Sequence, residues 1–229
     1  MSSSVLSSAT LLMLIGLAVG LAYWFRRVDA ARIEEFQALA ARRGWALNVK
    51  EQRLGRPAVM RLSPRAGGTW RLETRLHGGN VGSGELQYTE FNITAPFWLE
   101  GTMVIGPQIP DDAAALSNFI AEKMDGPMGE RLLGRIIGEH SAADAAGLSL
   151  HDGPDTLTVL ANTRPGMRFD LVAVSRCMAS WNQQSNDTKD HPIVIINRDG
   201  LNVRLRQAIG RADKMEQFID MSLELARIM

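Results

Sequence analysis

The chain has 229 residues, of which 45% are apolar and 22% charged, so it is long enough for one sizeable domain and too apolar for a disordered protein. Lys plus Arg and Asp plus Glu each total 25, and this balance argues against a nucleic-acid-binding protein, which usually carries a basic excess. The single cysteine, Cys177, excludes an intramolecular disulfide and a cysteine-based zinc site.

The first element along the chain is an apolar segment that predicts a transmembrane helix. No charged residue occurs from Val5 to Phe25, and about 20 apolar residues in a helix span a hydrocarbon core of about 30 Å. A cleaved signal peptide needs a basic start, and residues 1–4 contain no Lys or Arg, so a retained anchor is the better interpretation. The expected span includes Leu11, Leu14, Gly16, Gly20 and Trp24.

The charge distribution predicts how this segment is oriented. All 25 basic residues follow it, and Arg26, Arg27 and Arg32 are near its end. The positive-inside rule then places the globular domain in the cytoplasm, with a periplasmic domain as the alternative. Gly16 and Gly20 form a G-x-x-x-G step, which favours either a homodimer through this pair or small residues that face lipid.

The rest of the chain predicts one α+β globular domain over residues 29–229, after an anchor over residues 1–28. An amphipathic helix is expected from Asp29, as its N-cap, to Arg43, with Gly44 ending it. Alternation from Trp70 to Leu76 predicts a half-buried strand. A change of phase between Tyr88 and Phe91 predicts a β-bulge or a bend in the next strand.

Shorter patterns complete the expected fold. The apolar runs around Asp199-Gly200 predict a hairpin with that pair at the centre of its turn. Cys177 is expected in the core, on a helix over 167–181. Further strands are expected at 58–62, 102–105 and 156–161, and further helices at 110–124, 127–137 and 212–229. Strands grouped before helices favour a mostly antiparallel sheet with packed helices.

Two polar stretches are the candidates for chemistry, and neither forms a complete motif. Glu139, His140 and Asp144 provide metal-ligating residue types without a paired-histidine pattern. His151 and Asp152 lie in a turn-rich stretch that lacks the partners of a catalytic triad. A ligand-binding or hydrolytic site in this region is therefore the alternative, beside polar helix ends and turns. We assign no catalytic residue, cofactor or metal ligand.

Arginines near two expected strands predict a basic surface, if the two strands lie on adjoining faces. Such a surface suits anionic lipid headgroups or an acidic partner, and a solvated sheet face is the alternative. The residues concerned are Arg71, Arg75, Arg204, Arg206 and Arg211.

Two short motifs resemble those of a group of uncharacterised bacterial single-span membrane-anchored proteins of unknown function. They are Phe36-x-x-Leu39-Ala40-x-Arg42-Arg43-Gly44-Trp45 and Arg198-Asp199-Gly200-Leu201-x-Val203-Arg204-Leu205-Arg206. The resemblance implies a bacterial inner (cytoplasmic) membrane setting and carries over no catalytic residue. Together with the predicted anchor, it favours a non-enzymatic accessory protein that binds or organises a membrane-associated protein partner.

Overall fold

The fold is that of a computed structural model, which describes residues 2–52, 56–76, 87–94, 101–108, 148–163, 169–183 and 191–229. The predicted helices over 110–137 lie outside these residues, as do Glu139, His140 and Asp144.

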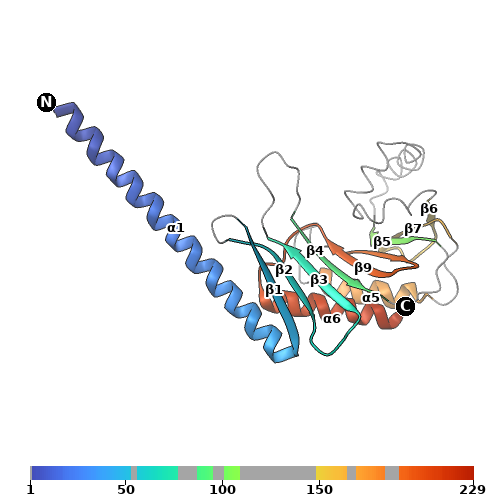
Figure 1. The fold of residues 1–229 in the computed structure, drawn as a ribbon. Helices are drawn as coiled ribbons and strands as arrows, with labels where there is room; N and C mark the ends of the chain where they lie inside the picture. The colour runs from blue at the N-terminus through green and yellow to red at the C-terminus, as the bar shows by residue number, and fades with distance from the viewer. Residues whose placement is uncertain are drawn as a thin grey trace.

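The described residues form an α+β fold built on one antiparallel sheet, as predicted. The sheet has nine strands in the order β1-β2-β3-β4-β9-β8-β5-β7-β6, and every neighbouring pair is antiparallel. The strands are β1 (Trp45–Gln52), β2 (Arg56–Pro64), β3 (Trp70–Arg75), β4 (Tyr88–Ile93), β5 (Met103–Pro107), β6 (Ser149–His151), β7 (Leu157–Ala161), β8 (Ile193–Asn197) and β9 (Gly200–Leu205). Figure 1 shows the two C-terminal helices beneath this sheet.

Helix α1 (Ser2–Arg43) is one continuous helix of 42 residues, about 60 Å long at the usual rise per residue. The predicted N-cap at Asp29 is therefore wrong, because Asp29 lies inside the helix, where it forms an ion pair with Arg32. No Pro or Gly separates Trp24 from this point, so nothing in the sequence interrupts the helix. The helix ends where predicted, and Gly44 follows it with a φ of 69°.

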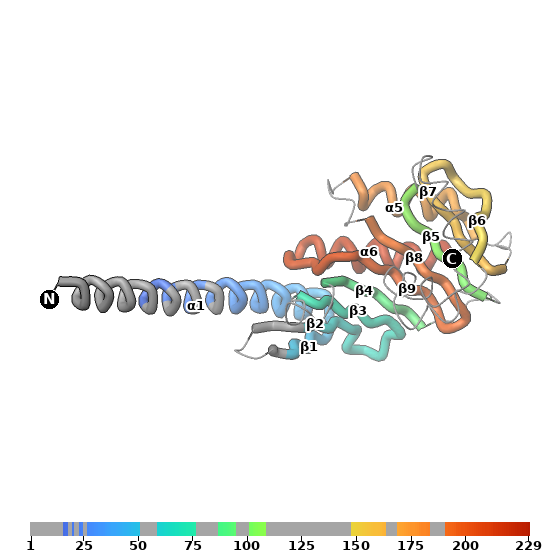
Figure 2. The backbone as a smooth tube through the Cα atoms, turned by 90° about the horizontal axis from the view of Figure 1, so that it is seen from above, coloured from blue at the N-terminus to red at the C-terminus, as the bar shows by residue number. Residues whose placement is uncertain are grey.

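Only the C-terminal part of α1 packs into the domain. Phe36, Leu39 and Ala40 are buried against the sheet, whereas the N-terminal part of the helix extends away from it (Figure 1). Figure 2 shows the end of α1 beside α6 (Ala212–Ile228). The element predicted as a separate amphipathic helix is thus the continuation of the N-terminal helix into the core.

The main hydrophobic core lies between the sheet and its helices. Helix α5 (Leu171–Asn182) presents Val174, Met178 and Trp181 to this core, and Cys177 is buried beside them as predicted. Helix α6, predicted over 212–229, adds Phe218 and other apolar residues at helical spacing, which pack against the apolar residues of β2, β3, β4 and β9.

Two details of strand geometry differ from the sequence predictions. β4 pairs with β3 in unbroken register from Tyr88 to Ile93, so no bulge occurs in this described strand; Tyr88 and Phe91 simply point to opposite faces. In the β8–β9 hairpin, Asn197 pairs with Gly200, so the turn centres on Arg198 and Asp199, one residue earlier than predicted.

The glycine of this hairpin is needed for close packing of the backbone. Gly200 has a φ of 144°, and a Cβ at this position would lie 2.0 Å from the carbonyl oxygen of Ile93 in β4. The Asn197 side chain holds the turn by accepting hydrogen bonds from the backbone N–H groups of Asp199 (3.0 Å) and Gly200 (3.2 Å).

Candidate functional site

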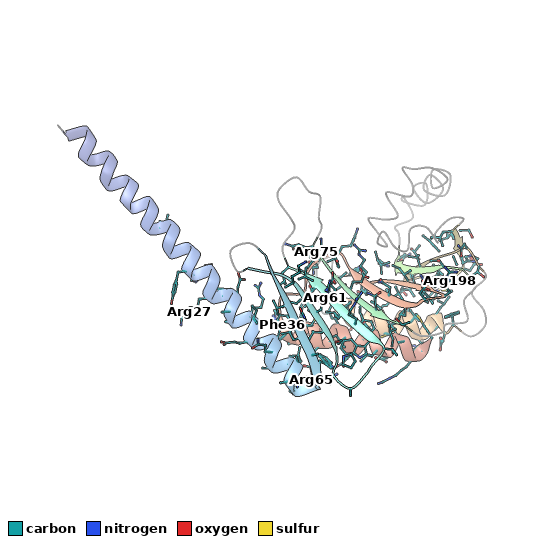
Figure 3. The ribbon with its side chains drawn as sticks, viewed as in Figure 1. Arg27, Phe36, Arg61, Arg65, Arg75 and Arg198 are labelled. Atoms are coloured by element: carbon teal, nitrogen blue, oxygen red, sulfur yellow. The ribbon has the colours of Figure 1, made fainter. Side chains whose placement is uncertain are left out.

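The sheet face opposite α5 and α6 carries a row of charged and polar side chains across β2, β3, β4 and β9. In the strand register, Arg61 lies opposite Glu73, Glu73 opposite Glu90, and Glu90 opposite Arg204. Side chains that pair across strands point to the same face, so this row is continuous. We call it the charged face; its members are Arg61, Arg71, Glu73, Arg75, Tyr88, Glu90, Asn92, Asn202 and Arg204. Figure 3 shows Arg61 and Arg75 on the side of the sheet away from the helices.

Glu73 and Tyr88 form the centre of the charged face. The Tyr88 hydroxyl donates a hydrogen bond to Glu73 Oε1 at 2.7 Å, and Arg61 Nε donates one to Glu73 Oε2 at 2.8 Å. Burial on its own raises the pKa of Glu73, but the hydrogen bonds from Tyr88 and Arg61 and the charges of Arg61 and Arg71 outweigh it, so the pKa is lowered. Glu73 therefore stays ionised at neutral pH.

The same contacts have the opposite effect on the pKa of the Tyr88 phenol, which is raised. Burial, the hydrogen bond to Glu73 and the negative charge of Glu73 raise the pKa of Tyr88 from 10.0 to about 12. The guanidinium of Arg75 lies 5.4 Å from the centre of the Tyr88 ring, and that of Arg204 lies 5.0 Å from it. Two cations from strands on either side thus converge on one neutral aromatic ring.

A second polar group lies beside this ring on β4 and β9. The amide nitrogens of Asn202 and Asn92 donate hydrogen bonds to Glu90 Oε1 at 2.7 Å and 2.9 Å, and Arg204 forms an ion pair with Glu90 at 3.7 Å. The Arg204 side chain is only 11% exposed. Within the described residues, its buried Nε and the Oδ1 of Asn202 have no hydrogen-bond partner. Such groups are costly to bury and mark where a polar ligand could bind.

The structure brings together part of the predicted basic surface. Arg71, Arg75 and Arg204 share the charged face, because β4 joins β3 to β9. Arg206 is exposed just beyond the end of β9. Arg211 lies further on, at the start of α6, where it forms an ion pair with Asp213 at 2.6 Å and thereby lowers the pKa of that carboxyl group.

The other half of this sheet face is apolar. Val104 of β5 and Ile195 of β8 lie opposite each other and pack in a second hydrophobic cluster with Leu148 and Ile193. These four side chains are buried, so they offer no free surface.

Of the alternative hydrolytic region, the described residues include His151 and Asp152. His151 lies on the edge strand β6, where its Nε2 is 3.3 Å from Ser149 Oγ and 3.3 Å from the carbonyl oxygen of Ala161. Among the described residues this serine and histidine have no acidic hydrogen-bond partner, and a catalytic triad needs one. Asp152 is exposed on the adjoining turn.

The described residues also contain no group of three His, Cys, Asp or Glu side chains that could hold a metal ion. Burial raises the pKa of the Cys177 thiol to about 12, with further contributions from the charge of Glu224 and a hydrogen bond to it, so the thiol stays protonated and unreactive.

Among the residues that the structure describes, none of the helices combines the length and the apolar content needed to cross a membrane. No protein-family model, curated protein or solved structure matches this chain.

Sequence reasoning missed the acidic and aromatic members of the charged face. The alternation in β3 places Glu73 between Arg71 and Arg75 on one face, and this pattern could have been recognised in the sequence. The contacts of Tyr88 with Arg204 and of Glu90 with Asn202 depend on the pairing of β4 with β9, which joins residues more than 100 positions apart in the sequence.

Proposed function

We propose that this chain is a non-enzymatic protein anchored in the bacterial inner membrane by α1, and that its α+β domain binds or organises a membrane-associated protein partner. The observation that carries the proposal is the division of α1 into two parts. Phe36, Leu39 and Ala40 at its C-terminal end are core residues, and its N-terminal end extends beyond the domain.

The sequence of the extending part supports its placement in lipid. It carries no charge from Val5 to Phe25, and Arg26 and Arg27 follow immediately, as at a cytoplasmic membrane boundary. Leu17, Tyr23 and Trp24 are more than half exposed, at 62%, 69% and 56%. An apolar stripe of this kind needs an apolar environment, and Tyr and Trp are favoured at the membrane interface.

The continuity of α1 also fixes how near the bilayer the domain would be. From Arg27 to the first fully buried residue, Phe36, the helix rises by about 14 Å. A domain held this close by a helix encounters membrane partners at a raised effective concentration. The proposed task is therefore to present a binding domain at the membrane surface, with the domain on the cytoplasmic side.

The anchor is tested by alkaline extraction of membranes from cells that make the full chain. We expect wild-type protein to remain with the bilayer, and Leu14→Arg to shift it into the extract, because an arginine at the centre of a span costs about 2.5–3.5 kcal/mol. Val172→Arg is the control, since Val172 is 53% exposed on α5 and outside the proposed span. Extraction of the wild-type protein would refute the anchor.

The partner is tested on the same full chain by purification in mild detergent followed by a salt wash. The interaction role is supported by a partner that stays at a fixed stoichiometry with the wild-type protein. The same partner should be lost when charged or exposed residues on the surface of the domain are substituted. A chain that purifies alone or only as a homodimer contradicts it.

A further inference from the structure

We draw no further inference here: the strongest candidate, the polar side-chain cluster of Glu90, Asn92, Asn202 and Arg204 on the charged face, keeps one donor and one acceptor without a partner in the described part of the chain, but both atoms are closed off from solvent and nothing in the structure shows what covers them.

Discussion

Tyr88 is the central residue of the charged face. Its ring contacts the guanidinium groups of Arg75 and Arg204, and its hydroxyl donates a hydrogen bond to Glu73. The phenol must stay protonated to donate that hydrogen bond. Its pKa is raised from 10.0 in the unfolded chain to about 12, so the protonated form is favoured by folding. The resulting stabilisation is complete below pH 10 and is lost as the pH rises from 10 to 12.

Replacing Glu73 by Gln should lower the pKa of Tyr88 from about 12 while leaving it above 10, because the charge and the carboxylate acceptor are removed but burial persists. The measurement is a titration of the phenolate ultraviolet absorbance, with Tyr88→Phe identifying the signal beside that of Tyr23. Glu90→Gln is the control, because Glu90 is a smaller contributor, and it should give a smaller decrease. An unchanged pKa in Glu73→Gln would show that the hydrogen bond is not formed.

At the scale of single elements, the joint between α1 and β1 depends on one glycine. Gly44 ends the helix with a φ of 69°, and Trp45 begins the first strand directly after it. Arg43, the last helical residue, lies over the Trp45 ring at 5.1 Å and forms ion pairs with Glu216 and Asp220 of α6. The joint thus holds α1, the sheet edge and α6 in one arrangement.

Gly44→Ala should destabilise the domain by about 1–2 kcal/mol, the cost of a left-handed backbone for a residue with a side chain. No heavy atom lies within 4 Å of the added Cβ, so the effect would be conformational strain alone. Gly106→Ala is the control, since its Cβ also meets nothing within 4 Å and its φ is ordinary. Denaturant titration followed by tryptophan fluorescence measures both; equal free energies of unfolding would contradict the role assigned to Gly44.

Elements with a strong local pattern were predictable, and those that depend on distant pairing were not. Alternation predicted β3, and helical spacing predicted α6. β1 was missed although Trp45, Leu47 and Val49 alternate with polar or small residues over the eight residues that directly follow Gly44. The strand order, in which β4 pairs with β9 across more than 100 residues, has no local signal.

The charged face shows the same division between local and distant information. Phase alone predicted that Arg71 and Arg75 share a face, and the hairpin predicted the position of Arg204 on β9. That these two groups are neighbours follows only from the insertion of β4 between them. Sequence reasoning therefore identified the arginines but not the aromatic ring and carboxylates that organise them.

For the whole molecule, the continuous α1 would set the height of the domain above the bilayer that we propose for its N-terminal part. Each inserted helical residue raises the domain by about 1.5 Å along the helix axis and turns it about that axis by about 100°. A turn about an axis that crosses the bilayer leaves the height of the domain unchanged, so the rise is the quantity to test. Two alanines inserted between Ala30 and Ala31 leave the buried contacts of Phe36 and Leu39 unchanged and raise the domain by about 3 Å, and four alanines raise it by about 6 Å.

The expected result is read from a fluorophore at Gln87→Cys, an exposed position next to Tyr88, in bilayers that contain headgroup-quencher lipids. Native Cys177 can remain, because burial raises the pKa of its thiol to about 12 and keeps it unreactive. Quenching should be strong in the parent chain, weaker after the two-residue insertion and weakest after the four-residue insertion, because each insertion raises the domain further. Equal quenching in all three chains would mean that α1 does not set the height of the domain above the bilayer.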